Sequence, residues 1–461
     1  MNAAELDAAT NPVAARADQR IGTRSLALYA LPNVPHSLAL LPVINFVPAF
    51  YADERALPLA LVGLMLFLTR ITDIFTDPII GIWSDCLRTR IGRRKPFILA
   101  GLPIICASVW FVFVPPAEAG LMALFGGLFF IYLGFTIVDL PYNAWGAELS
   151  NDYDERSRIS AWRGAAGSVG TLAALSIPLL LQSLGQPGTG TALFWMALFF
   201  VIAQPAAFLL TIMRLPESAP ADLNETPQPF VQSLRMTLSN GPFVRLLIAT
   251  TLIIAAMTIG ATLNLLMFKH VIGAQEAFPV AIFLQNIAAL IGIPLWTMVA
   301  RRRGKHGAMA AAAAWIALCL AGSFLWGRGD AIGFSATMIA LGLGLGGLLF
   351  LAQALTADVT DKDLLETGRE RTATYYAVLG MGTKAAIAVG VLLGTSVPAL
   401  TGFQPSDPVH SAGSLLGVRA VYAFAGLPLM IAAIWLLWHY PLTRAAQEEL
   451  RAAIAARRAK P

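Results

Sequence analysis

Two aspartates, Asp73 and Asp77, stand four residues apart in a largely apolar stretch of the chain. In a helix this spacing places both carboxylates on one face, one turn apart. Such a stretch is typical of a membrane span, where a charged side chain costs about 2.5–3.5 kcal/mol on insertion scales. The carboxylates repel one another unless a cation, a proton or a basic partner lies between them. We interpret the pair as a site for Na⁺ or a transferable proton.

The structural alternative is a fixed ion pair, because Arg70 precedes Asp73 by three residues and shares its helix face. Three further charges lie within or at the start of apolar stretches: Asp139, Arg163 and Lys384. With these, three acidic and three basic residues balance, and we expect one shared interior network because unpaired buried charge is costly. Thr136 stands three residues before Asp139, so its hydroxyl can join a cation shell.

The composition indicates what surrounds these charges. The chain has 461 residues, of which 57% are hydrophobic and 13% charged. A soluble domain carries about 25% charged residues, so we expect a polytopic membrane protein. The net charge of +5 does not indicate nucleic-acid binding, because the basic residues cluster at loop positions. The three cysteines have no paired spacing and predict neither a disulfide framework nor a metal site.

Twelve apolar stretches approach the roughly 20 residues that cross a bilayer. All should be helices, because backbone polar groups in lipid must be satisfied within the segment. We therefore predict an all-α membrane protein. The stretches begin near Pro35, Pro58, Pro96, Leu121, Ile159, Ala192, Arg245, Ala277, Ala308, Ala331, Thr374 and Leu415.

The twelve spans fall into two halves of six, separated by a proline-containing polar segment. The halves echo one another: Ala147-Glu148 precedes span 5, and Ala357-Asp358 precedes span 11. Such duplication is typical of a two-bundle alternating-access carrier. The predicted division is a tail at residues 1–30, a six-helix bundle at 31–213, a linker at 214–240, a second bundle at 241–440 and a tail at 441–461.

Lys and Arg residues predict the orientation of the chain. They gather in the loops after spans 2, 4, 8 and 10, whereas the opposite loops hold few, chiefly Arg55, Lys269 and Arg328. The positive-inside rule therefore places both termini and the linker in the cytoplasm, in a plasma (inner) membrane. The polar N-terminus lacks a cleavable signal pattern, so we expect the first apolar segment to direct insertion.

The basic loop after span 2 carries the pattern Gly-x-x-x-Asp followed by Arg-x-Gly-Arg-Arg. This pattern resembles the signature that major facilitator carriers hold between spans 2 and 3. Carboxylates at helix ends pair with arginines and helix N-termini, so such a loop can latch one face of a carrier closed. A simple topology anchor is the alternative. The residues concerned are Gly81, Asp85, Arg90, Gly92, Arg93 and Arg94.

The charged residues of spans 2, 4, 5 and 11 together resemble the glycoside–pentoside–hexuronide:cation symporter family, whose relatives include lysolipid carriers. The resemblance covers almost the whole chain, in order and spacing. It implies the major facilitator fold. It also implies a cation site of Asp73, Asp77 and Thr136, with Asp139, Arg163 and Lys384 near the substrate.

The sequence departs from the sugar carriers of that family in two places. Their span 1 has an acidic residue that grips sugar hydroxyls, and this place falls near Ser37 here. Their aromatic residue in span 4, which stacks on the sugar, falls at Asn143. We add both residues to the predicted substrate site. We expect the neighbouring His36 to be a helix-end histidine.

We therefore predict a cation-coupled secondary transporter, not an enzyme, that moves a sugar, glycoside or related solute. No cofactor beyond Na⁺ or H⁺ and no nucleic acid are expected, and we expect a monomer. A carrier of a lysolipid-like amphiphile, with Lys384 facing a phosphate, is one alternative. A non-transporting receptor or assembly factor on the same fold is another. An intramembrane aspartyl protease is disfavoured, because Asp73 and Asp77 share one helix beside an arginine.

Overall fold

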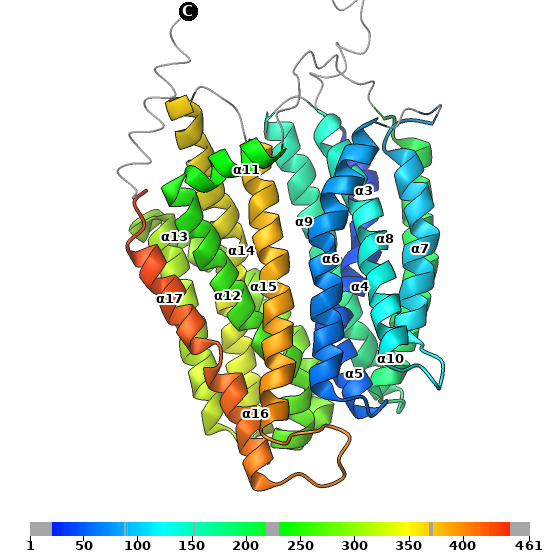
Figure 1. The fold of residues 1–461 in the computed structure, drawn as a ribbon, viewed down its shortest axis with the longest axis vertical. Helices are drawn as coiled ribbons and strands as arrows, with labels where there is room; N and C mark the ends of the chain where they lie inside the picture. Colours follow the sequence, from blue (N-terminus) through cyan, green and yellow to red (C-terminus); the bar gives the residue numbers. More distant parts are fainter. Residues whose placement is uncertain are drawn as a thin grey trace, which may run out of the picture. The chain divides into compact units, whose positions relative to one another are not determined.

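The protein is almost entirely helical in the computed structural model, which describes residues 21–86, 89, 91–150, 153–217, 230–367 and 372–442 (Figure 1). The first half contains α3 (Thr23–Ala30), α4 (Asn33–Asn45), α5 (Val47–Asp53), α6 (Leu59–Cys86), α7 (Lys95–Phe113), α8 (Leu121–Glu148), α9 (Tyr153–Ser183) and α10 (Thr189–Arg214). The rest comprises α11 (Phe230–Ser239), α12 (Gly241–Leu266), η1 (Met267–Ile272), η2 (Gln275–Ala277), α13 (Phe278–Gly322), η3 (Ser323–Leu325), α14 (Ala331–Thr367), α15 (Thr372–Leu400), α16 (Ala412–Phe424) and α17 (Leu427–Trp438).

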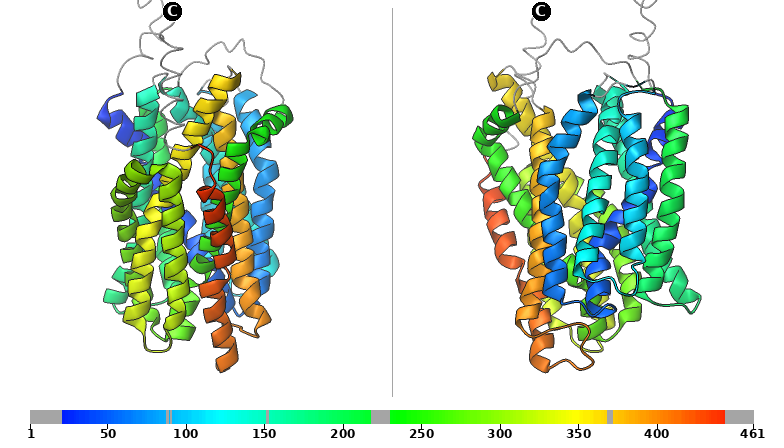
Figure 2. Two further views of the ribbon diagram at one scale, coloured as in Figure 1. Left: turned by 90° about the vertical axis from the view of Figure 1, so that its left-hand side faces the viewer. Right: turned by 45° about the vertical axis from the view of Figure 1, so that its right-hand side comes forward.

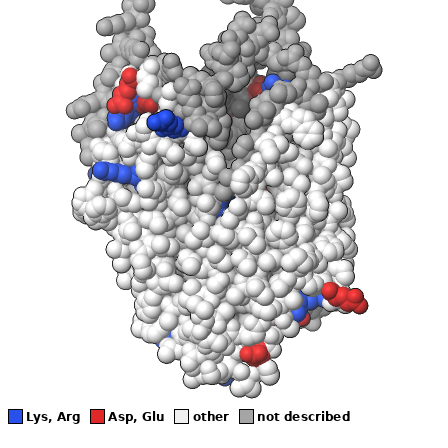
Figure 3. Space-filling model, in the orientation of Figure 1, with Lys and Arg blue, Asp and Glu red and all other residues white. Residues whose placement is uncertain are grey.

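Eleven segments of the described chain are long and apolar enough to cross a membrane. One of them, Gln275–Leu325, contains two of the predicted spans. Their helices follow one another within α13 and are joined at a kink, where Gly304 has a non-helical backbone conformation. The predicted all-helical membrane architecture is therefore confirmed. On the face shown in Figure 3, most of the visible Lys, Arg, Asp and Glu side chains lie toward the two ends of the helices.

The chain divides into two compact units. The first comprises residues 1–47 and 68–226, and the second comprises residues 48–67 and 227–461. In the first, α7 packs against α8, and α4 packs against α9 and α10. In the second, α13 packs against α14, and α12 packs against α15. Figure 2 shows that most helices within each unit run along a common direction.

The first span begins earlier than the sequence predicted. It starts at Thr23 and runs to Asn45, whereas the apolar pattern suggested a start near Pro35. Pro35 lies in the first turn of α4, where a proline is tolerated because the missing N–H would have no helical partner. Pro32 and Pro35 therefore lie where α3 gives way to α4, within one membrane span.

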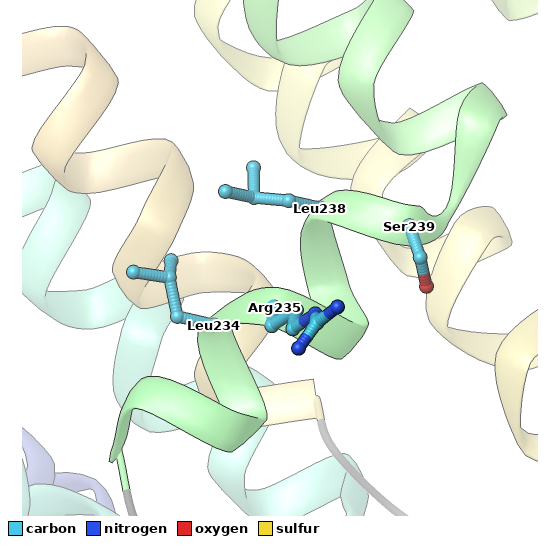
Figure 4. A pocket seen from close by; sticks show the side chains of 4 residues that line it. All are labelled: Leu234, Arg235, Leu238 and Ser239. Atoms are coloured by element: carbon cyan, nitrogen blue, oxygen red, sulfur yellow. The ribbon is translucent and has the colours of Figure 1, made fainter.

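The predicted linker contains a helix of its own. α10 ends at Arg214, and α11 lies across the ends of α12 and α15 (Figure 1). A hollow of about 460 Å³ lies against α11 and is lined by Leu234, Arg235, Leu238 and Ser239 (Figure 4). None of these four residues belongs to the predicted site.

The glycine-rich part of α14 packs closely against α13. A Cβ on Gly346 would stand 1.9 Å from the carbonyl oxygen of Ala289, and one on Gly342 would stand 2.2 Å from that of Gln285. Gly292 of α13 meets the carbonyl oxygen of Leu343 just as closely, at 2.2 Å. Small residues let the two backbones approach, as in many membrane helix pairs.

Candidate functional site

Asp73 and Arg70 form an ion pair within α6. Arg70 Nη1 donates to Asp73 Oδ2 at 3.0 Å, and only 2% of the Asp73 side chain is exposed. The Arg70 guanidinium also lies over the Tyr132 ring of α8, 4.0 Å from its centroid. A cation over an aromatic face is stabilised by the negative charge of the ring face. Asp73 is thus held by a basic partner, as the structural alternative required.

Asp77, one turn further along α6, accepts a hydrogen bond from Thr136 of α8 at 2.9 Å. These residues, 59 positions apart, were both predicted to belong to a cation site, and the fold brings them together. The arrangement presents hard oxygens, which suit Na⁺. A hydroxyl has one proton and two lone pairs, so Thr136 can donate its proton to Asp77 and still offer a lone pair to a cation.

Asp139 lies close to the histidine that was assigned to a helix end. His36 Nε2 stands 3.2 Å from Asp139 Oδ2, which is an ion-pair distance when the imidazole is protonated. His36 is buried in the second turn of α4, and its ring packs edge-on against Phe135 at 4.5 Å between centroids. Gln204 of α10 reaches the other ring nitrogen at 3.5 Å. Sequence reasoning missed Gln204, whose only signal is an amide in an apolar span.

Arg163 and Asn143 also meet in the first unit. Arg163 Nη1 donates to Asn143 Oδ1, and its guanidinium lies 4.8 Å from the Tyr142 ring centroid. Asn33 of α4 donates to the backbone oxygen of Arg163 at 2.9 Å. Ser37 lies on the face of α4 that meets α9, where a Cβ on Gly167 would stand 3.0 Å from its hydroxyl oxygen. Elements α4, α8 and α9 therefore carry the predicted substrate residues of this unit.

Lys384 lies on α15, in the second unit, and its side chain is half-buried. The acidic residues of the proposed network belong to the first unit. The charge network between Lys384 and these residues therefore stays a prediction.

The basic loop after α6 is fixed by backbone and side-chain contacts. Gly92 has a φ of +119°, which a residue with a side chain rarely adopts. Gly81 and Asp85 lie in the last turns of α6, but the Asp85 side chain and all of Arg90 are outside the described residues. The predicted role of Asp85 and Arg90 is therefore not addressed by the structure.

Two arginines of the loop converge on one carboxylate. Arg93 Nη2 and Arg94 Nη2 lie 2.5 and 2.8 Å from Glu148 Oε1, at the end of α8. Arg94 also donates to Ser84 Oγ at 2.9 Å and is buried. The loop thus ties α6 to α8 in the first unit.

Glu217, just after α10, is a further partner that the sequence reasoning missed. Its Oε1 accepts from the backbone N–H groups of Arg93 and Arg94, each at 2.7 Å. These N–H groups lie at the N-terminus of α7. A carboxylate is favoured there by the helix dipole and by N–H groups that have no partner within the helix. A Cβ on Gly92 would stand only 2.0 Å from Glu217 Oε2, so a side chain at this position would displace the Glu217 carboxylate.

The second unit has an ion pair that corresponds to the pairing of Arg93 and Arg94 with Glu148 in the first unit. Lys305 Nζ lies 2.7 Å from both carboxylate oxygens of Asp358 and 3.2 Å from the backbone oxygen of Ala354. Asp358 and Glu148 are the acidic residues of the two echoing segments predicted from the sequence. The internal repeat therefore extends to the contacts within each unit.

Another charged cluster in the second unit was not predicted. Asp53 forms an ion pair with Lys269, and its other oxygen lies 3.7 Å from His270 Nε2. His270 Nδ1 in turn lies 2.9 Å from His410 Nε2. Lys269 stands out in the sequence as a basic residue in an otherwise bare set of loops, which is the signal that could have led to the cluster.

Comparisons with known proteins agree with this architecture. Residues 28–444 match the family described as MFS/sugar transport protein. The glucuronide carrier protein homolog of Escherichia coli (strain K12) is 24% identical, over 92% of this chain and 94% of its own length. The sodium-dependent lysophosphatidylcholine symporter 1-A of Danio rerio is 22% identical, over 92% and 86%. A crystal structure of the nucleoside transporter NupG shares the fold, with a TM-score of 0.66, 14% identity and coverage of 91% and 100%.

Proposed function

Because the chain belongs to the MFS/sugar transport protein family, we propose that it carries a sugar, glycoside or related small solute together with Na⁺ or H⁺. The chain is an integral membrane secondary transporter, not an enzyme, and resembles the glycoside/cation symporters of the major facilitator superfamily. The coupling ion and the substrate class are the parts that we propose.

The observation that carries the proposal is the Thr136–Asp77 hydrogen bond beside the Arg70–Asp73 ion pair. Asp73 is ion-paired with Arg70, and Asp77 accepts a hydrogen bond from a hydroxyl of another helix. A carboxylate and a hydroxyl in an apolar span can be joined by Na⁺ or can take a proton. Asp77 is accordingly the proposed coupling residue.

The proposed substrate residues are those near the second acidic position of the unit. Arg163 of α9 donates a hydrogen bond to Asn143 of α8. Asp139, Ser37 and Lys384 complete the proposed set. Cation and solute are coupled if each binds more tightly in the presence of the other. The coupling free energy between them is the same in both directions.

A lysolipid-like amphiphile is the second candidate substrate. The observation that favours it is that Asn143 stands where the sugar carriers have an aromatic residue. The side-chain oxygen of Asn143 accepts a hydrogen bond from Arg163. Span 1 also carries no carboxylate. The Danio rerio relative is named for such a substrate. In this case the proposed role of Lys384 is to face the phosphate.

A stabilisation screen on purified protein tests the proposal. Sugars, glucuronides and lysophosphatidylcholine are added with and without Na⁺, at two pH values, and the melting temperature is recorded. A ligand at 100 times its Kd adds about 2.7 kcal/mol. We expect one class to stabilise, more strongly with the coupling ion, and Asp77→Asn to remove the ion effect. If no class stabilises the protein and none shows counterflow, the proposal is wrong.

The proposed orientation places both termini and the Arg93–Arg94 loop in the cytoplasm, in the inner membrane. A single cysteine at Thr89, which is exposed in the structure, reports on it. Labelling by an impermeant reagent from outside intact cells contradicts this orientation. We also propose that the carrier acts as a monomer.

A further inference from the structure

α11 presents an exposed arginine at one end of the second unit. Arg235 makes no ion pair with any of the described residues, and it lines the hollow of about 460 Å³ together with Leu234, Leu238 and Ser239. Figure 4 shows that Leu234 and Leu238 extend to the same side of α11, whereas Arg235 turns away from them. A helix with leucines on one side and a cation on another is typical of helices that lie in a membrane interface.

The bend between α11 and α12 is fixed by one asparagine. α12 begins at Gly241 with Pro242 in its first turn, and the side chain of Asn240 caps it by accepting from the N–H of Phe243 at 3.1 Å. The Asn240 amide also donates to the Tyr375 hydroxyl of α15 at 3.1 Å. α11 is thereby held across the ends of α12 and α15 (Figure 1).

A second exposed arginine stands on the other side of this bend. Arg245 of α12 donates from Nη1 to the backbone oxygen of His439 at 2.8 Å. Because an α-helix rises 1.5 Å per residue, Arg235 and Arg245 each lie roughly 8 Å along their helix from Asn240. The two cations are therefore close enough to act on one patch of membrane surface.

Tryptophans mark the level of the membrane surface beside Arg245. α17, which packs against α12, ends at Trp438, and Trp435 and Trp438 are 61% and 73% exposed. His439, whose backbone oxygen accepts from Arg245, follows directly. Tryptophan is enriched where the hydrocarbon of a bilayer gives way to the headgroups. Arg245 and the nearby α11 therefore lie at the level of the lipid headgroups.

The acidic residues at this end of the unit line a different hollow. Asp363 and Glu366 of α14 line a hollow of about 530 Å³ with Met236 of α11, and Ser239 borders both hollows. Met236 follows Arg235 directly, so the two side chains point in directions about 100° apart around the helix. Among the described residues, no acidic side chain lines the hollow that holds Arg235. That hollow is therefore suited to a negatively charged ligand.

We propose that α11 and the start of α12 form a binding site for an anionic phospholipid of the cytoplasmic leaflet. Arg235 and Arg245 contact the phosphate, and Leu234 and Leu238 rest on the acyl chains near the glycerol. The proposed orientation places this end of the second unit at the cytoplasmic surface, where anionic lipids attract nearby basic residues. None of these four residues belongs to the proposed cation or solute site, so the bound lipid is not the transported solute.

Native mass spectrometry of the full chain tests the lipid class, with equal amounts of phosphatidylglycerol and phosphatidylcholine in the micelles. We expect the chain to retain phosphatidylglycerol about fivefold or more over phosphatidylcholine, because each surface arginine adds about a factor of five in affinity. Arg235→Gln/Arg245→Gln should lose this preference. Arg214→Gln/Arg328→Gln removes two exposed arginines elsewhere and, as the matched control, should keep it. Equal retention of both lipids by the unmodified chain, or an unchanged preference in Arg235→Gln/Arg245→Gln, overturns the proposal.

A spin label at position 238 tests whether the occupant is a membrane lipid. The label is attached to Leu238→Cys in a chain whose own cysteines are replaced by alanine, in phosphatidylglycerol vesicles. We expect it to be more accessible to oxygen, and less to a water-soluble nickel complex, than a label at Thr89→Cys. The single variant Arg235→Gln changes only an exposed side chain and should lessen this difference.

Two results of these measurements identify another occupant. A label at position 238 that stays fully accessible to the nickel complex overturns the proposal, because the leucines then face water or a soluble partner. Displacement of phosphatidylglycerol by inorganic phosphate indicates a site for free phosphate and overturns it as well. Neither measurement uses transport, so the outcome is independent of the solute and of the coupling ion.

Discussion

The hydroxyl of Thr136 donates a 2.9 Å hydrogen bond to the carboxylate of Asp77 and so joins α8 to α6. One turn earlier, Asp73 is held by Arg70 of the same helix. The two aspartates on one helix face therefore differ in the contacts described here: Asp73 has an ion pair, and Asp77 has a hydrogen bond from a hydroxyl. The difference predicts that substitutions at the two positions act on different properties of the carrier.

Removal of the Thr136 hydroxyl should weaken cation dependence. Thr136→Val keeps the side-chain volume but loses the oxygen, and a hydrogen bond contributes about 0.5–1.5 kcal/mol. We expect the concentration of Na⁺ or H⁺ for half-maximal effect to rise up to about tenfold. Thr136→Ser keeps the hydroxyl and serves as the control. Equal cation dependence in both variants contradicts a ligand role for Thr136.

Loss of Arg70 should reduce stability more than it reduces coupling. Arg70→Gln leaves Asp73 buried without the guanidinium, and breaking a buried pair costs about 3–5 kcal/mol. The double variant Arg70→Gln/Asp73→Asn should recover most of this loss, because both charges are then removed together. Thermal unfolding of the two purified variants measures the difference. An unstable double variant indicates that packing on Tyr132, not charge, is what Arg70 supplies.

The charge of Lys384 should matter for coupling. We predict that Lys384→Ala damages uphill transport more than Lys384→Arg, because an ammonium group can compensate acidic residues when no coupling ion is bound. A fluorescent reporter of inward and outward states should show a shifted balance in Lys384→Ala. Normal uphill transport with unchanged cation dependence assigns Lys384 to an interfacial or lipid-facing position and removes it from the network.

The close approach of α13 and α14 should not tolerate a methyl group. Gly346→Ala directs a Cβ at a backbone oxygen 1.9 Å away, and overpacking of this kind costs about 1–3 kcal/mol. Gly380→Ala on α15 meets nothing within 4 Å and is the matched control, with a gain of up to about 1 kcal/mol in helix propensity. Melting temperatures that fall equally in both variants contradict the packing argument.

Much of the fold could be predicted because membrane helices leave a strong pattern. Length and hydropathy located the spans. The echoing segments that contain Glu148 and Asp358 each carry an ion pair in the structure, which the sequence did not predict. Thr136 and Asp77, which the family resemblance assigned to one cation site, lie in contact in the structure. The start of the first span was wrong, since Pro35 looked like a boundary but occupies a first turn.

The contacts that escaped prediction depend on tertiary geometry. Glu217 follows a span in a polar, proline-containing segment, and nothing in that segment points to the N-terminus of α7. His36 pairs with Asp139 across 103 positions, and Gln204 joins them from a third helix. Spacing along one helix predicts which residues share a face, whereas the neighbour on another helix depends on how the helices pack.

Asp77 is the residue that we propose couples an ion to the movement of a solute. Uphill accumulation is measured in proteoliposomes with an imposed Na⁺ or H⁺ gradient, for the unmodified carrier and for Asp77→Asn, using the probe that stabilises the purified protein. Exchange without a gradient serves as the control for folding and insertion. We expect Asp77→Asn to lose accumulation and to keep exchange. Full uphill accumulation by Asp77→Asn contradicts a coupling role for Asp77.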